Sequence, residues 1–223
     1  LYRMDSWQED MDRLLYVLPL IGTVFKKTQW TPDGRPESVL VMPDDMIVNY
    51  YATNWERARK THVKFMDRNE MIEKMRSGQY LEFTLPTEAE MPDPEEWEED
   101  DPMGEPIALP DDYPFTVLEQ HCWWDLDGDG YEEPYVVEVI EELEKVVRVL
   151  PRYNLKRVVN DHSGRIQRID PIEYINVFKF FPSVDSVIYG VGWGKLLGPL
   201  NSATNTIINQ LLNSGTMATM PAG

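Results

Sequence analysis

The stretch that decides the fold is WWDLDGDGYEEPYVV, which runs from Trp123 to Val137. Residues with a high preference for strands lie on both sides of its centre, over Phe115–Trp124 and Tyr135–Ile140. Asp and Gly dominate the centre itself, and both residue types favour tight turns. The sequence therefore predicts two antiparallel strands joined by a short loop.

This loop also has the residue pattern of a calcium site. Three aspartates alternate, with Gly130 at the sixth place, so that carboxylates can converge on a hard cation while the glycine takes the sharp turn. The twelfth place holds Val136 where a helix-loop-helix calcium hand carries glutamate, so the loop is not an EF-hand. A solvated Asp-Gly turn without metal is the alternative. The predicted calcium ligands are Asp125, Asp127, Asp129, Tyr131 and, at the ninth place, Glu133.

The composition excludes several classes of function. The chain has 223 residues, of which 42% are hydrophobic, enough to bury a core. Its formal net charge of −18 repels phosphate backbones, so tight wrapping of nucleic acid is not expected. Cys122 is the only cysteine and the three histidines are scattered, which excludes a disulfide framework and a zinc pattern. No apolar run is long enough to span a bilayer, so we expect no membrane partner.

The sequence predicts no catalytic residue, and we expect the protein not to be an enzyme. Carboxylates are plentiful, but no motif sets one in an apolar pocket opposite an exposed one, as acid–base chemistry would require. His121 and Cys122 are adjacent on a predicted strand, so their side chains would point to opposite faces and could not form a dyad.

Residues 1–85 predict a mixed region of helices and strands. An amphipathic helix is expected from Trp7 to Leu18, with Pro19 and Gly22 ending or bending it. Strands are expected over Thr23–Trp30, Ser38–Met42 and Met46–Tyr51, with a Pro32-Asp33-Gly34 turn after the first.

Two further predictions concern helical residues in the same region. Asp67 and Glu70 have the spacing of a capping box, which would start a short helix that Gly78 ends. A basic group has no Gly-rich loop beside it, so a solvated helix face is expected there in place of a phosphate site. Its members are Arg57, Arg59, Lys60 and Lys64.

Residues 86–112 form an acidic, proline-rich excursion. From Glu82 to Asp112 there are thirteen acidic residues and no Lys or Arg. Mutual repulsion and the prolines oppose a packed core, so an extended loop is expected. Trp97 is the one residue within it that suggests a docking contact.

Residues 113–192 predict a β-rich region built around the hairpin. Short β-prone runs follow one another, separated by turn residues, and this spacing is typical of an antiparallel meander. Beyond the hairpin these runs are Lys145–Leu150, Leu155–Asn160, Arg165–Ile169 and Ile175–Phe181.

The last segment differs from the rest because it is almost uncharged. From Ser186 to Gly223 the only charged side chain is Lys195. A helix is expected over 193–215, ended by Gly215, with 216–223 as the start of a continuation. Its apolar stripe and neutral polar face favour packing on both sides, in a bundle or between subunits; a core helix without its downstream partner is the alternative. The predicted packing or channel residues are Leu196, Leu200, Asn201, Asn205, Ile207, Ile208 and Leu211.

These elements predict an α+β protein with antiparallel β-rich segments and several helices, including a long uncharged C-terminal helix. Their order resembles the portal proteins of tailed bacteriophages. The resemblance is carried by DLDGDGYEEPY at Asp125–Tyr135 and by YGVGW at Tyr189–Trp193, which opens the uncharged helix. It implies a wing-like region over 1–85, a clip-like region over 113–192 and a stem-like helix over 193–215. We also expect the chain to be an internal piece of a longer polypeptide.

What the family implies is a structural role at the portal vertex of a virion. Its members form a homo-oligomeric ring, typically of twelve subunits, assembled in the host cytoplasm. Double-stranded DNA passes through the ring during packaging and ejection without sequence-specific binding. The terminase packaging motor docks on it, and head-completion or tail adaptor proteins follow.

A calcium-stabilised adhesion or binding module without ring assembly is the alternative function. The hairpin suggests it, because DxDGDG loops of this kind resemble those of integrin-type repeats. Repeat architectures need several units to bury a core, however, and the motif occurs once in this chain.

Overall fold

The computed structural model describes residues 4, 7–31, 34–49, 51–85, 114–184 and 188–219. The predicted turn residues Pro32 and Asp33 lie outside these ranges, as does the acidic excursion over 86–112 with Trp97. The α+β class is confirmed, with three helices and antiparallel sheets in the described part of the chain. None of these helices combines the length and apolarity that a membrane crossing requires.

The chain divides into two compact units, Leu1–Pro43 with Tyr174–Gly223 and Asp44–Glu173. This division follows spatial contacts and so joins segments that are far apart in the sequence. The portal-like regions over 1–85, 113–192 and 193–215 were inferred from a resemblance in sequence. The division by contacts does not test them, so they stay a prediction.

The first unit is a three-stranded antiparallel sheet, in the order β10-β1-β2, with helix α1 packed beside it. Its core contains Val24, Phe25 and Ile175, all fully buried, and Leu14 from the helix. The backbone N–H of Leu40 donates to the carboxylate of Asp10 at 3.3 Å and ties the helix to the sheet. The elements are α1 (Trp7–Ile21), β1 (Thr23–Trp30), β2 (Pro36–Val41), β10 (Ile175–Lys179), β11 (Phe181–Pro182), β12 (Gly190–Val191) and α3 (Trp193–Thr219).

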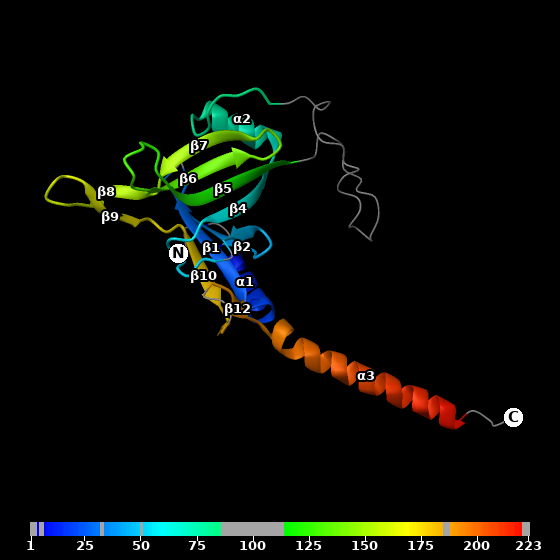
Figure 1. The fold of residues 1–223 in the computed structure, drawn as a ribbon. Coiled ribbons are helices and arrows are strands. Elements are labelled where there is room, and N and C mark those ends of the chain that lie inside the picture. Colours follow the sequence, from blue (N-terminus) through cyan, green and yellow to red (C-terminus); the bar gives the residue numbers. More distant parts are fainter. Residues whose placement is uncertain are drawn as a thin grey trace. The chain divides into compact units, whose positions relative to one another are not determined.

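The second unit contains a five-stranded antiparallel meander in the order β3-β4-β5-β6-β7 (Figure 1). Helix α2 and the residues after it supply Met71 and Tyr80 to a core that strands β4 to β7 complete with Met66, Phe115, Val117, Ile140 and Val147. A separate two-stranded sheet is formed by β8 and β9. The elements are β3 (Met46–Val48), β4 (Lys60–Met66), α2 (Arg68–Arg76), β5 (Phe115–Trp124), β6 (Glu133–Ile140), β7 (Lys145–Pro151), β8 (Tyr153–Asn160) and β9 (Ile166–Pro171).

Three local predictions are corrected by these elements. The basic residues from Arg57 to Lys64 do not form a helix face, because Lys60 opens strand β4 and is fully buried. Asp67 takes the cap position of α2, but its side chain makes no capping hydrogen bond, so the capping box is not formed. Gly215 does not end α3, which continues to Thr219, because this glycine keeps an ordinary helical backbone.

The meander prediction holds for β5, β6 and β7 and fails beyond them. Among the described strands, β8 and β9 pair only with each other, and β10 pairs with β1, more than 140 residues earlier in the chain. Helix α1 runs through Pro19 and ends before Gly22, whose φ of 98° is a left-handed conformation that favours glycine.

Candidate functional site

The aspartate loop, residues 125–132, joins β5 to β6 as the sequence predicts. The two strands meet at its base, where Trp124 lies opposite Glu133. Gly128 and Gly130 have φ values of 76° and 90°, so both turns of the loop use the left-handed backbone that glycine adopts without strain. The loop is therefore a tight hairpin tip held by two long strands.

The structure brings the three predicted aspartate ligands together. Asp125, Asp127 and Asp129 each offer a carboxylate oxygen, and these oxygens lie within 4.8 Å of one another. Backbone N–H groups fix their orientation: Gly128 and Gly130 donate to the two oxygens of Asp125 at 2.7 and 3.0 Å.

The other two aspartates also accept backbone hydrogen bonds inside the loop. The N–H of Asp129 donates to Asp127 Oδ1 at 3.2 Å, and the N–H of Tyr131 donates to Asp129 Oδ1 at 2.8 Å. Each carboxylate is held by a backbone donor two to five residues further along the chain.

Glu133, the fourth predicted carboxylate, stands at the base of the loop and outside this close group. It is only 4% exposed, and its Oε2 is buried with no hydrogen-bond partner in the described part of the chain. Burial raises the pKa of Glu133, and the negative charges of Asp127, Asp129 and Asp125 raise it further. The tip thus combines a polar aspartate cluster with a buried carboxylate, one oxygen of which has no hydrogen-bond partner in the described part of the chain.

Helix α3 is the second predicted site, and its side chains face solvent along its whole described length. Every described side chain from Trp193 to Met217 is exposed, including all seven predicted packing or channel residues. The apolar ones are among the most exposed in the molecule: Ile207 is 57% exposed and Leu211 66%.

The polar side of α3 satisfies part of its own hydrogen bonding. The hydroxyls of Thr204, Thr206 and Thr216 donate to the carbonyls of residues four positions earlier, at 2.8 to 2.9 Å. The hydroxyl protons of these threonines are therefore already donated within the helix. No charge other than that of Lys195 interrupts the described helix.

The start of α3 is fixed by backbone-to-backbone contact. A Cβ added to Gly22 would lie 2.2 Å from the nitrogen of Gly192, and one added to Gly192 would lie 2.3 Å from the carbonyl oxygen of Leu20. Trp193 packs against Phe180 and Phe181, with ring centroids 5.8 Å apart in both cases. The end of α1 and the start of α3 are therefore in close contact, which only glycine allows.

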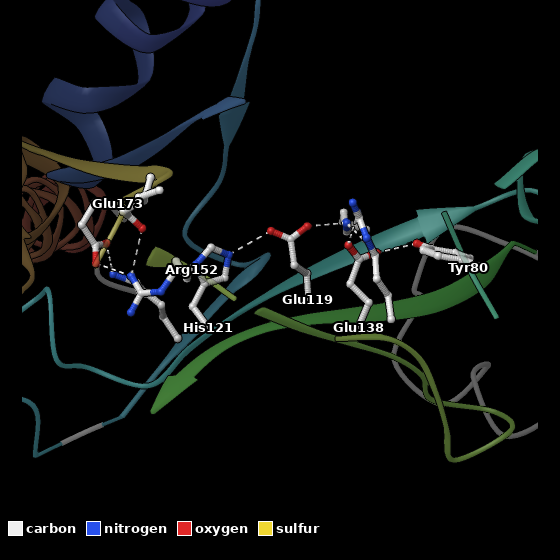
Figure 2. A network of polar contacts seen from close by, with 10 residues as sticks. Tyr80, Glu119, His121, Glu138, Arg152 and Glu173 are labelled. Atoms are coloured by element: carbon white, nitrogen blue, oxygen red, sulfur yellow. Dashed lines mark hydrogen bonds and ion pairs between the residues drawn. The ribbon is translucent and has the colours of Figure 1, made fainter. Parts of the chain in front are cut away.

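A third feature, which the sequence reasoning missed, is a buried charge network in the second unit (Figure 2). At one end the carboxylate of Glu173 accepts hydrogen bonds from Lys60 Nζ and from Arg152 Nη1, and both cationic side chains are fully buried. Burial lowers the pKa of Lys60 to about 8, because the attraction of Glu173 only partly offsets desolvation and Arg152 opposes it. The network comprises Lys60, Lys64, Tyr80, Glu119, His121, Glu138, Arg148, Arg152 and Glu173.

The other end of the buried charge network joins strands β4, β5 and β6. Lys64 Nζ lies 2.5 Å from Glu119 Oε2 and 3.6 Å from Glu138 Oε2, and these two carboxylates raise the pKa of Lys64 although burial lowers it. Tyr80 donates its hydroxyl to Glu138 at 2.5 Å, while His121 lies 2.9 Å from Glu119. Burial lowers the pKa of His121 more than Glu119 raises it, so the ring is kept neutral.

The sequence does contain a signal for this network. Lys60, His62 and Lys64 alternate along one β-prone run, as Glu119 and His121 do along another, so each set lies on one face of its strand. The observed register places His62 opposite Glu119 and Lys60 opposite His121. Complementary charges on alternating positions of two runs indicate pairing across a sheet.

Compared with known proteins, the chain matches no protein-family model, and it has no significant match among curated proteins.

Proposed function

We propose that this chain is a subunit of a bacteriophage portal ring, the conduit through which DNA enters the capsid and leaves it. Two features of the sequence support the proposal, the DLDGDGYEEPY hairpin and the glycine-opened, uncharged helix that resemble the portal family. The observation that carries it is helix α3, 27 residues long, with its apolar side chains exposed.

Exposed apolar residues on α3 favour self-association. Burying a Leu or Ile side chain contributes about 1.5–3 kcal/mol relative to leaving it in water. Leu196, Leu200, Ile207 and Leu211 recur at helical spacing, so one neighbouring helix can cover them together. Identical copies that pack through different faces form a closed ring when the rotation between them closes.

The charge of the chain is compatible with DNA moving past it. With a net charge of −18, the protein repels a phosphate backbone and does not hold it. The packaging motor and the head-completion or tail adaptor proteins would dock on the assembled ring at the portal vertex of the virion. The role is structural and requires no bond chemistry from this chain.

The experiment that tests the proposal is negative-stain imaging of the full-length protein, combined with mass measurement under near-native conditions. A ring with a central hole is the expected result, with a mass that is a whole multiple of one subunit. A stable monomer in both measurements overturns the proposal. A monomer that instead binds a cell-surface ligand in a calcium-dependent way supports the adhesion-module alternative.

A further inference from the structure

We propose that the β5–β6 hairpin tip binds one calcium ion through Asp125, Asp127 and Asp129, and that the ion also compensates the charge of Glu133 at the base of the loop. The ion would fix the tip of the second unit whether or not the chain assembles into a ring. The inference stands on two independent observations, the convergence of the three aspartates and the buried Oε2 of Glu133, which has no hydrogen-bond partner in the described part of the chain.

The spacing of the aspartates fits a single calcium ion. Calcium takes oxygen ligands at about 2.3–2.6 Å, so two oxygens bound to one ion lie at most about 5 Å apart. The aspartate oxygens lie within 4.8 Å of one another. One ion can therefore contact all three without rearrangement of the backbone.

The hydrogen bonds inside the loop orient these carboxylates without using up their oxygens. A carboxylate oxygen has two lone pairs, and each backbone N–H occupies one of them. Asp125 accepts from Gly128 and Gly130 through both oxygens and still has two lone pairs left for an ion.

A solvated turn without metal does not explain the burial of the Glu133 carboxylate. Burying an ionised carboxylate without a partner is costly, and proteins normally pair such a group or use it to coordinate a metal. Its Oε2 has no such partner in the described part of the chain, although the side chain is 96% buried by the surrounding protein. The β6 strand places it opposite Trp124, next to the residue that begins the aspartate loop. A cation at the tip would compensate Glu133 and the three aspartates together.

The ligand set favours calcium over other common metals. All four side chains offer hard oxygen atoms, whereas zinc prefers the nitrogen and sulfur of His and Cys. Magnesium requires near-ideal octahedral geometry and retains several waters, while calcium accepts six to eight oxygens in a flexible arrangement. The backbone carbonyl of Tyr131, at the seventh place, and water would complete the sphere.

The test is calcium titration of the full chain by calorimetry. Terbium luminescence is a second measurement, because Trp123 and Trp124 lie next to the loop and can transfer excitation to a bound lanthanide. The expected results are one site per chain, a rise in melting temperature that EGTA reverses, and at least tenfold weaker binding of magnesium. A titration that releases no heat, with no terbium signal and an unchanged melting temperature, overturns the proposal.

Three variants locate the site. Asp127→Asn should weaken binding at least tenfold because it removes one negative charge, and it is a mild change, since the Asn Oδ1 can still accept the 3.2 Å hydrogen bond from the N–H of Asp129. Glu133→Gln removes the charge at constant shape and should weaken binding at least tenfold. Asp161→Asn is the matched control: Asp161 caps the β8–β9 turn by accepting from the N–H groups of Ser163 and Arg165, and calcium binding should remain unchanged.

Binding that persists in both Asp127→Asn and Glu133→Gln would place the ion elsewhere and refute the assignment. Should either variant fail to fold, terbium competition by calcium in the unmodified protein still decides whether the tip binds the ion. Neither result depends on ring assembly, which imaging tests separately.

Discussion

The five-stranded sheet and helix α3 depart from the usual distribution of side chains in opposite ways. The sheet buries Lys60, Arg152 and other charged groups and pairs them with carboxylates of the same chain. The helix exposes Leu200, Ile207 and other apolar groups and pairs them with nothing in the described chain. The sheet completes its contacts internally, whereas the helix presents surface that a second molecule would have to cover.

This difference between the sheet and the helix predicts that a charge introduced on α3 disrupts ring assembly but leaves the five-stranded sheet intact. Ile207→Asp in the full-length protein should abolish ring formation, because a carboxylate would have to be buried between subunits without a partner. Native mass measurement should show monomers, with the circular dichroism of the fold preserved. Ile207→Leu keeps an apolar side chain at this position and should still form rings; intact rings from Ile207→Asp would refute the placement of this residue between subunits.

Removing one member of the buried charge network should be the most damaging single change within the sheet unit. Glu173→Gln leaves Lys60 and Arg152 without their carboxylate, and breaking a buried ion pair in this way costs about 3–5 kcal/mol of unfolding free energy. Urea denaturation measures the loss. Asp170→Asn breaks the exposed pair with Arg168 and should cost less than about 1 kcal/mol; equal losses would contradict the distinction between buried and exposed pairs.

The neutral state of His121 should make the sheet unit sensitive to mild acid. Because burial lowers its folded pKa below the usual 6.5, the unfolded chain binds a proton first, and stability falls as the pH drops below about 6.5. The expected slope from this group is at most about 1.4 kcal/mol per pH unit. Glu138, whose pKa is lowered because Lys64 and Tyr80 outweigh burial, adds its own loss only below about pH 4.5.

The contribution of His121 is the difference between the parent protein and a His121 variant in urea unfolding from pH 7.5 to 5.5, because Lys60, with a pKa of about 8, contributes to both. His121→Gln should flatten the dependence, while His162→Gln, at an exposed turn position, should keep the slope of the parent protein. An unchanged slope in His121→Gln would show that the buried ring is not the group responsible.

The smallest predicted effect is a gain in stability. Gly215 lies inside α3, and a Cβ added there meets nothing within 4 Å, so Gly215→Ala should stabilise the helix by about 0.5–1 kcal/mol. Thermal unfolding of the variant in an Ile207→Asp background keeps the comparison between monomers. A loss of stability there would mean that α3 packs tightly at this position within its own chain.

Sequence reasoning located the elements whose signal is local. Strands β1 and β5 have the predicted boundaries, Thr23–Trp30 and Phe115–Trp124, because β-prone residues and turn residues mark them directly. The aspartate loop was predicted for the same reason. The three aspartates are neighbours in sequence, and the turn itself brings their carboxylates together.

What sequence reasoning missed depends on partners far away in the chain. The alternation of Lys60 and Lys64 indicates one face of a strand, but only the pairing of β4 with β5 and of β5 with β6 brings Glu119 and Glu138 to that face and buries it. The pairing of β10 with β1 was equally hidden, since strand propensity does not identify a partner. The prediction that Gly215 ends the helix was wrong for a different reason. A glycine often ends a helix, but the residues around Gly215 continue the helical pattern.

The contact between Gly22 and Gly192 has a mechanical consequence. A helix of 27 residues is a rod about 40 Å long, so a change of a few degrees at its base moves the far end by several ångströms. Backbone packed directly on backbone leaves no side chain to change rotamer, and the ring of Trp193 is wedged against two phenylalanines beside it. The joint between α1 and α3 is therefore closely packed, and bending under a load on the rod is expected first at Pro199, inside the helix, where a backbone hydrogen bond is missing.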